Sequence, residues 1–218
     1  MKVIYNLFKK DFLLIRKYLP IILGVIMIFP IFISYRTPLF QRSGNILYDA
    51  LVLMITFMVY HSVSMEEMKQ KGEIYLRITP MQSNKIAIAK YIVVTFSFII
   101  TTALFLILSN IPITNVGKID IKNIFLVFVL IEIFFSIYIP MTFKFGYVKL
   151  QLISTSIIFV SPFIIPLIAN HMENDMTIIA NIQNSPIWMI VGLSLLIVCA
   201  SINIGIMASS NIIKNKEY

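Results

Sequence analysis

The sequence has few of the residues on which most soluble enzymes depend. In 218 residues it has one cysteine, two histidines and ten acidic residues, and only 13% of its residues are charged. The single cysteine, Cys199, excludes an intramolecular disulfide and the paired-cysteine spacing of zinc and redox sites. No G-x-x-x-x-G-K-[ST] segment occurs, which excludes ATP binding through that phosphate-binding loop.

Hydrophobic residues make up most of the chain, at 59%, and the mean hydropathy is +0.90. Apolar runs of about 20 residues recur, and that length crosses about 30 Å of hydrocarbon as a helix. A backbone exposed to lipid must satisfy its own hydrogen bonds. The sequence therefore predicts an all-α membrane protein. We expect six transmembrane helices, approximately at Tyr18–Ser34, Ile46–Met65, Tyr91–Ile111, Ile124–Phe143, Leu150–Ala169 and Ile187–Ser209.

The net charge of +8 is distributed unevenly over the connections between these spans. Fourteen basic residues lie on one side: Lys2, Lys9, Lys10, Arg16, Lys17, Lys69, Lys71, Arg77, Lys85, Lys90, Lys144, Lys149, Lys214 and Lys216. Four lie on the other: Arg36, Arg42, Lys118 and Lys122. Cytoplasmic flanks of spans collect Lys and Arg, so we expect both termini in the cytoplasm of a bacterial cell and a multi-pass protein of its plasma membrane. The same explanation makes a nucleic-acid partner unnecessary.

Residues 1–17 have apolar and basic side chains on opposite faces at helical spacing. This pattern, with Phe8 and Phe12 on the apolar face, is typical of a helix lying in the membrane interface and contacting lipid. Asp11 falls within the apolar face. Two interpretations of it stay open: an ion pair with a cation from another cytoplasmic element, or an edge residue that reaches water. The remaining chain divides into the six-span domain, 18–209, and a cytoplasmic tail, 210–218.

Ionisable residues inside spans are the usual pointers to function in membrane proteins. Glu132 lies near the middle of the fourth expected span, Asp49 near the outer end of the second and His61 one turn from its cytoplasmic end. All three are candidates for a substrate pathway. The alternatives are a Glu132 carboxyl that is hydrogen-bonded to a neighbouring helix, a structural Asp49 and a packing His61. Prolines in the fifth span and the long external segment 170–186 favour a kinked helix or a short external helix there, with a solvated loop as the alternative.

Residues 66–90, "EEMKQKGEIYLRITPMQSNKIAIAK", form a charged cytoplasmic segment between the second and third spans. Glu66–Lys71 is expected to continue the second helix, Gly72 to bend it and Pro80 to precede the third span. A solvated connector is one interpretation. The apolar side chains of Tyr75 and Leu76 favour a second one, docking on the bilayer or on a cytoplasmic protein. Glu66-Glu67 also suggests an intramembrane peptidase, but Lys71 stands where that motif has arginine, and His61 alone cannot complete a metal site.

Two stretches resemble the type-2 ABC exporter permeases. Leu7-Phe8-Lys9-Lys10-Asp11-Phe12 is similar to the "xLxKKDF" opening of many small bacterial members. "EIYLRITPMQSNKIAIAKY" is similar to a segment between their second and third spans, with matches at Glu73, Tyr75, Leu76, Pro80, Ile86, Lys90 and Tyr91. Ile78-Thr79 and Asn84-Lys85 depart from the family pattern.

The resemblance implies six spans, cytoplasmic termini, and a permease that pairs with a second, identical or different, permease subunit. It also implies two ABC ATPase subunits that bind ATP and Mg, so that this chain is not an enzyme and carries no cofactor. Segment 66–90 then contains the coupling helix that docks on the ATPase. The docking candidates are Glu66, Glu67, Lys69, Lys71, Gly72, Glu73, Tyr75, Leu76, Arg77 and Pro80.

The expected function is export of an amphipathic peptide or lipid-like substrate, as in exporters of antimicrobial peptides and phenol-soluble modulins. Such export would give antimicrobial resistance. Two alternatives remain from other classes of membrane protein. One is a non-enzymatic immunity protein that sequesters a peptide. The other is a substrate-binding membrane subunit of a vitamin uptake system.

Overall fold

The computed structural model describes residues 2–36, 44–70, 82–152, 155–156 and 186–215. Every element in these ranges is helical: α1 (Lys2–Ile15), α2 (Leu19–Arg36), α4 (Asn45–Lys69), α6 (Ser83–Asn110), the 3-10 turn η1 (Pro112–Thr114), α7 (Ile121–Phe145) and α10 (Ile187–Asn215). A further helical stretch covers 147–152. Within the described residues the expectation of an all-helical protein is confirmed.

Five of the helices are long and apolar enough to cross a membrane: α2, α4, α6, α7 and α10. They correspond to the expected first, second, third, fourth and sixth spans. The expected fifth span, 150–169, lies mostly outside the described residues, as does external segment 170–186. The multi-pass architecture is confirmed for five candidate spans, and the sixth stays a prediction.

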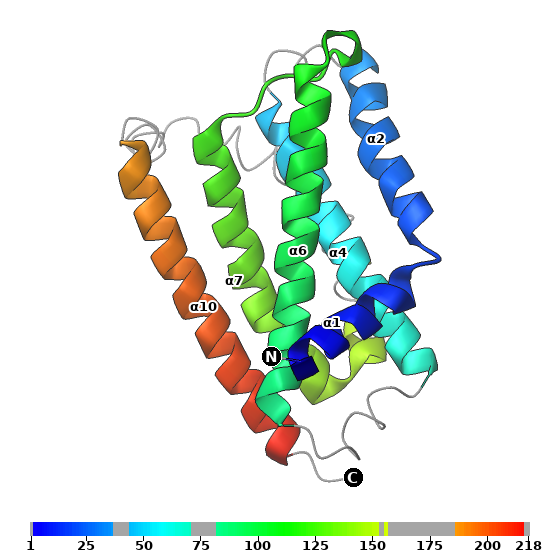
Figure 1. Ribbon diagram of the computed structural model, residues 1–218, viewed down its shortest axis with the longest axis vertical. Coiled ribbons are helices and arrows are strands. Elements are labelled where there is room, and N and C mark those ends of the chain that lie inside the picture. The colour runs from blue at the N-terminus through cyan, green and yellow to red at the C-terminus, as the bar shows by residue number, and fades with distance from the viewer. Residues whose placement is uncertain (1, 37–43, 71–81, 153–154, 157–185, 216–218) are drawn as a thin grey trace.

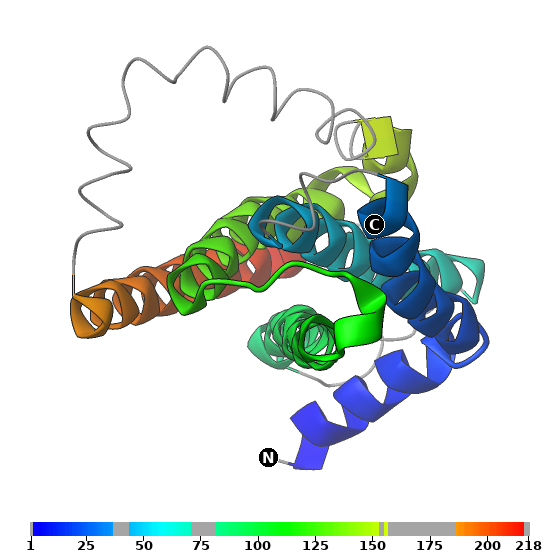
Figure 2. The same ribbon diagram turned by 90° about the horizontal axis from the view of Figure 1, so that it is seen from above.

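The five long helices run roughly alongside one another, while α1 lies across them near one end (Figure 1). Seen from above, α6 lies beside the row formed by α10, α7 and α4, and α1 lies at the edge of the bundle (Figure 2). Helix α6 contacts all five of the other described α-helices. We call the end where α1 lies the α1 end. It also holds the last turns of α4, α7 and α10 and the first turns of α6.

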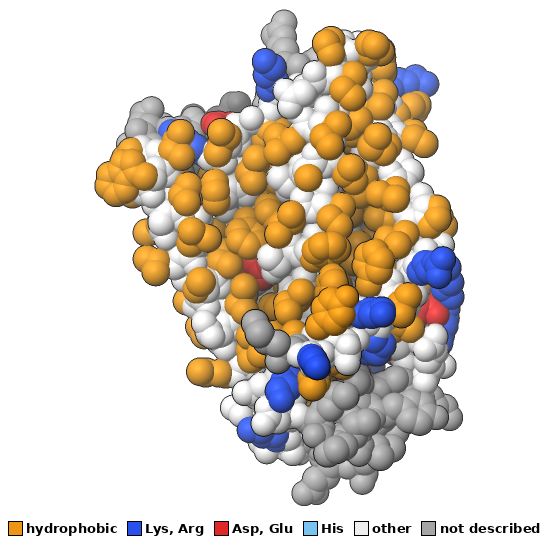
Figure 3. Space-filling model, viewed as in Figure 1, with side chains coloured by type: hydrophobic (Ala, Val, Ile, Leu, Met, Phe, Trp, Pro, Cys, Tyr) orange, Lys and Arg blue, Asp and Glu red, His pale blue; other side chains and the backbone are white. Residues whose placement is uncertain are grey.

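Large hydrophobic side chains remain exposed along the long helices, including Ile28, Ile137, Leu196 and Ile204. Hydrophobic side chains cover the middle of the molecular face shown in Figure 3, and Lys and Arg side chains gather toward its ends. Such a belt would aggregate in water but is the surface that a bilayer requires. Inside the bundle, Tyr48 and Phe105 pack edge to face and are fully buried.

Helices α4, α6 and α7 are longer than a bilayer requires. At 25, 28 and 25 residues, each exceeds the roughly 20 residues that cross the hydrocarbon. Helix α6 begins at Ser83, eight residues before the expected start of the third span at Tyr91. Lys90 is therefore part of a helix and not of a connecting loop, and this corrects the expected boundary. Similarly, α4 continues through Lys69, as the helix-forming residues after Met65 predicted.

A close backbone contact fixes the other end of α4. The amide of Gly44 donates to the carbonyl of Lys118 at 3.2 Å. A Cβ atom at Gly44 would collide with the carbonyl group of Gly117. Glycine is therefore required at this position, where the connection between α6 and α7 passes over the start of α4.

Candidate functional site

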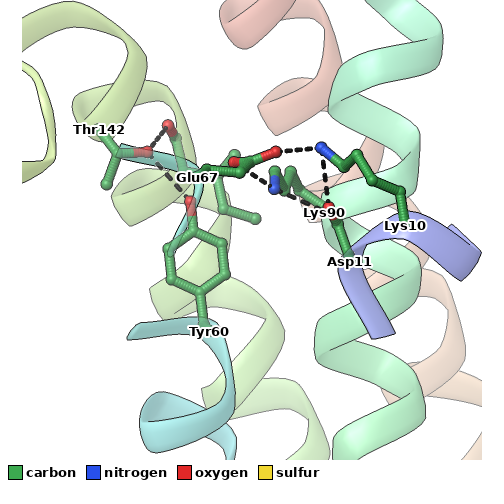
Figure 4. A network of polar contacts seen from close by, with 7 residues as sticks. Lys10, Asp11, Tyr60, Glu67, Lys90 and Thr142 are labelled. Carbon is green, nitrogen blue, oxygen red and sulfur yellow. Dashed lines mark hydrogen bonds and ion pairs between the residues drawn. The ribbon is translucent and has the colours of Figure 1, made fainter. Parts of the chain in front are cut away.

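A network of four charged side chains joins α1, α4 and α6 at the α1 end (Figure 4). The Lys90 Nζ atom lies 3.1 Å from Asp11 Oδ2 and 2.7 Å from Glu67 Oε2. The Lys10 Nζ atom lies 3.0 Å from Asp11 Oδ1 and also pairs with Glu67 Oε1. Each cation thus contacts both carboxylates, and the four formal charges cancel. We call these four residues the charge network.

The two central members of the network are almost fully enclosed. The side chain of Asp11 is 1% exposed and that of Lys90 is 4% exposed. Asp11 lies on the buried face of α1, one turn from Leu7 and one turn from Ile15. A buried charge is costly unless it is paired and hydrogen-bonded. Of the two interpretations of Asp11, the structure shows the ion pair, with a cation that comes from α6.

Glu66, next to Glu67, has a second set of partners. Its Oε1 accepts from the hydroxyl of Tyr18 at 2.7 Å and pairs with Lys17 Nζ at 2.8 Å. Lys69, one turn later on α4, approaches it at 3.3 Å. The hydrogen bond to Glu66 raises the pKa of Lys17 above its ordinary value. Glu66 therefore ties the last turn of α4 to the connection between α1 and α2.

Both neighbouring carboxylates of α4 thus face other parts of the same chain. Glu66 is 5% exposed, and the side chain of Glu67 is 13% exposed. Glu67 precedes residues 70–82 and Lys90 follows them, and the two are joined directly. The charge network consequently holds the end of α4 and the start of α6, on either side of this segment, next to each other and attaches both helices to α1.

A cavity of about 330 Å³ lies beside the network. Tyr60, Glu67, Lys90 and Thr142 are among the residues that line it. The hydroxyls of Tyr60 and Thr142 are hydrogen-bonded across α4 and α7 at 3.0 Å, as Figure 4 shows. These contacts continue the polar interior of the α1 end toward α7.

His61 lies near this cavity and has a defined partner. The Tyr147 hydroxyl is 2.5 Å from His61 Nδ1, and the His61 ring stacks on Phe57. This arrangement agrees with a histidine that packs and is hydrogen-bonded.

Glu132 lies elsewhere, between α7 and α6. Its Oε1 accepts from the Thr95 hydroxyl at 2.8 Å. The residue is fully buried, and its Oε2 has no hydrogen-bond partner among the described residues. The alternative of a carboxyl hydrogen-bonded to a neighbouring helix agrees with this geometry.

Asp49 accepts from the amide nitrogen of Asn123 at 2.6 Å, near the end opposite to α1. Asp49 and His61 are twelve residues apart on one helix, or about 18 Å along its axis. The three ionisable candidates of the spans, Glu132, Asp49 and His61, therefore have separate partners and do not form one site.

The aromatic residues expected on the membrane side of the first helix pack against α6. The ring of Phe96 lies 5.2 Å from that of Phe8 and 6.4 Å from that of Phe12, centroid to centroid. Most of the docking candidates lie outside the described residues: Lys71, Gly72, Glu73, Tyr75, Leu76, Arg77 and Pro80. Their role stays a prediction.

Sequence reasoning missed Lys10, Lys17 and Lys90 as partners, because it counted them toward the basic flank, and Lys10 and Lys90 also toward the family resemblance, without assigning them a contact. One signal was present. Lys90 stands inside the otherwise apolar run "IAIAKYIVV", and a lysine in such a position requires an anion or water nearby.

The sequence model of one protein family, described as "ABC-2 family transporter protein", matches residues 6–214. No curated protein and no solved structure matches the chain.

Proposed function

The chain belongs to the ABC-2 transporter family, and we propose that it is the membrane subunit of an exporter whose separate ATPase subunits dock on residues 66–90. ABC-2 permeases generally work with ABC ATPases. The sequence contains no phosphate-binding loop of the P-loop type, so under this proposal ATP and Mg are bound by the partner.

The observation that carries the proposal is the charge network. It joins α1, α4 and α6 at the place where the docking segment, residues 66–90, leaves α4 and enters α6. Residues 70–82 continue directly from α4 and into α6. The pair of Glu67 with Lys90 couples these two helices to each other, and the pairs with Lys10 and Asp11 couple both to α1. An ion-paired and buried junction resists bending more than a loop would. A push on the segment would therefore tilt α4 and α6 together.

The inward orientation of Glu66 and Glu67 changes the role that we propose for them. Their oxygens are bound by lysines of the same chain, so we assign them to anchoring the docking segment. Contact with the ATPase is assigned to the rest of the segment, with Tyr75 and Leu76 as apolar anchors. The other contact candidates are Lys69, Lys71, Gly72, Glu73, Arg77 and Pro80.

The proposed orientation places the α1 end in the cytoplasm of a bacterial cell. Of the described basic residues, eleven lie at the α1 end: Lys2, Lys9, Lys10, Arg16, Lys17, Lys69, Lys85, Lys90, Lys144, Lys149 and Lys214. Three lie at the opposite end: Arg36, Lys118 and Lys122. This bias supports cytoplasmic termini.

The proposed substrate is an amphipathic peptide or a lipid-like molecule. The exposed apolar belt and the polar groups inside the bundle, such as the buried Glu132 and the partly buried Thr95, suit a path along a permease dimer. Such a path would be lined by apolar surface with few polar contacts. A second copy of the chain or a related permease would complete it.

Co-purification tests ATPase docking. The tagged full-length protein is co-expressed with a candidate ABC ATPase and isolated in mild detergent. We expect the ATPase to be retained by the unaltered chain and lost from the variant Tyr75→Ala/Leu76→Ala. The matched control is Ile113→Ala, which removes a side chain that is 81% exposed at the opposite end. Failure of every ABC ATPase from the same cells to co-purify, or equal loss in the control, would refute docking at this segment.

The anchoring role of Glu67 is separable from docking. In Glu67→Gln the ATPase should still co-purify, because Glu67 does not contact it, while the amide weakens the pairs with Lys10 and Lys90. We expect ATP hydrolysis to continue and transport per ATP to fall severalfold in proteoliposomes. Loss of co-purification in Glu67→Gln would instead assign this carboxylate to the ATPase interface.

A further inference from the structure

A groove of about 820 Å³ runs between α1 and the end of α4. Its lining includes four cationic side chains: Lys9, Lys10, Arg16 and Lys17. Leu13 and Leu14 add an apolar part, and Glu66 is the one carboxylate among the described residues that line it. The groove is therefore both basic and partly apolar.

Half of this positive charge is compensated within the chain. Lys10 pairs with Glu67 and Asp11, and Lys17 pairs with Glu66. Among the described residues, no carboxylate lies within ion-pair distance of Lys9 or Arg16, and both side chains are exposed. The groove thus carries two uncompensated positive charges, Lys9 on α1 and Arg16 directly after its last residue.

The position of α1 decides which anion can reach these charges. Helix α1 lies across the bundle, where the apolar belt gives way to basic residues (Figures 1 and 3). It exposes Tyr5, Phe12 and Leu13 beside its cations, at 64%, 38% and 54%. Large apolar and basic side chains together on one helix surface are typical of a helix that lies among lipid headgroups.

A narrow apolar crevice lies on another face of α1, between α1, α2 and α6. It is lined by residues that include Phe12, Leu19, Leu23 and Phe96. Several of these side chains are exposed, so the crevice opens on the lipid-facing surface of the bundle. Acyl chains would therefore contact the helix that carries the basic groove.

We propose that the groove binds the phosphate group of an anionic phospholipid from the adjacent leaflet. Lys9 and Arg16 are the direct cationic contacts, and Leu13 contacts the upper part of the acyl chains. The guanidinium of Arg16 can hold two phosphate oxygens at once, and Lys9 supplies a point charge. A phospholipid matches both parts of the groove, its positive charge and its apolar surface.

The binding also has a consequence for the neighbouring charge network. Lys9 directly precedes Lys10 in the sequence, and Arg16 directly precedes Lys17. A phosphate bound to Lys9 and Arg16 would therefore reduce the electrostatic repulsion among the four cations. Lipid binding would then stabilise the attachment of α1 to Glu66 and Glu67. The position of α1 would depend on the anionic lipid content of the membrane.

Native mass spectrometry of the full-length protein in detergent tests the proposal. The protein is titrated with phosphatidylglycerol or with phosphatidylcholine of the same acyl chains, and the dissociation constant of the first bound lipid is measured. A basic side chain near an anionic surface contributes about fivefold in affinity. We therefore expect Lys9→Gln/Arg16→Gln to weaken phosphatidylglycerol binding by about 25-fold and to leave phosphatidylcholine binding unchanged.

The matched control is Lys144→Gln/Lys214→Gln, which removes the same charge at the α1 end outside the groove. It should bind phosphatidylglycerol as the unaltered chain does. Equal loss in the control, or equal affinity of the unaltered chain for the two lipids, would overturn the proposal. Displacement of phosphatidylglycerol by millimolar inorganic phosphate would also overturn it, because the ligand would then be a free phosphate.

Two further measurements separate the proposal from a folding defect and from an ATPase contact. Circular dichroism and thermal unfolding in detergent should be the same for the Lys9/Arg16 variant as for its control. If that variant keeps its preference for phosphatidylglycerol but loses a co-purifying ATPase, the groove is a protein contact and the lipid assignment is wrong.

Discussion

Replacement of Lys90 by methionine tests whether the charge network holds α1 against the bundle. The methionine side chain has a length similar to that of lysine and fills the same space, so the change removes mainly the charge. In Lys90→Met, Asp11 at 1% exposure would keep Lys10 as its one cation among the described residues, and Glu67 would lose its contact at 2.7 Å.

The expected magnitude follows from this burial. Removal of one partner of a buried ion pair costs about 3–5 kcal/mol, because the other charge is left buried without compensation. Lys10 is 35% exposed and can move toward Asp11, so we expect a loss at the lower end, about 3 kcal/mol. In the double variant Asp11→Leu/Lys90→Met, both charges are removed, and part of the loss should be recovered. The coupling between the two sites should be about 1–3 kcal/mol.

Equilibrium unfolding in mixed micelles, followed by circular dichroism, measures these free energies. Hydrogen–deuterium exchange provides a local readout, since amides of residues 2–15 should exchange faster in Lys90→Met than in the unaltered chain. The control is Lys85→Met on the same helix, with an expected effect within about 0.5 kcal/mol. A loss below about 1 kcal/mol with unchanged exchange in α1 would show that the network does not hold this helix.

Two further predictions concern packing and pH. In α10, Gly205→Ala should destabilise the protein by about 1–3 kcal/mol in the same unfolding assay, because the added Cβ would collide with the hydroxyl of Tyr91. The control is Gly192→Ala on the same helix, which has open space around it and should be neutral or slightly stabilising. The raised pKa of Lys17 means that, wherever Glu66 is ionised, their pair stabilises the fold fully below pH 10.5 and loses this effect as the pH rises through the folded pKa of Lys17. Unfolding curves of the unaltered chain and of Lys17→Arg, whose guanidinium stays charged, should therefore separate only above pH 10.5, and parallel curves across that range would contradict the pair.

Much of the fold is predictable from the sequence, because insertion into a bilayer depends on local hydrophobicity and length. The expected starts of the first, second, fourth and sixth spans lie within three residues of the observed helices. The third helix begins eight residues early, at Ser83. Hydropathy marks where a helix meets the hydrocarbon, whereas the helix itself continues as long as its polar residues find water or partners.

The sequence by itself determined that this is a helical membrane protein with an amphipathic first helix, a charged segment at 66–90 and no P-loop for ATP. These properties depend on residues close together in the chain. Only the tertiary structure decided what Asp11, Glu66 and Glu67 contact. The pair of Asp11 with Lys90 joins residues 79 positions apart, and that of Lys10 with Glu67 joins residues 57 apart. Hydrophobicity places each helix in the membrane, but the identity of ion pairs depends on how α1, α4 and α6 pack against one another, and no local pattern encodes that packing.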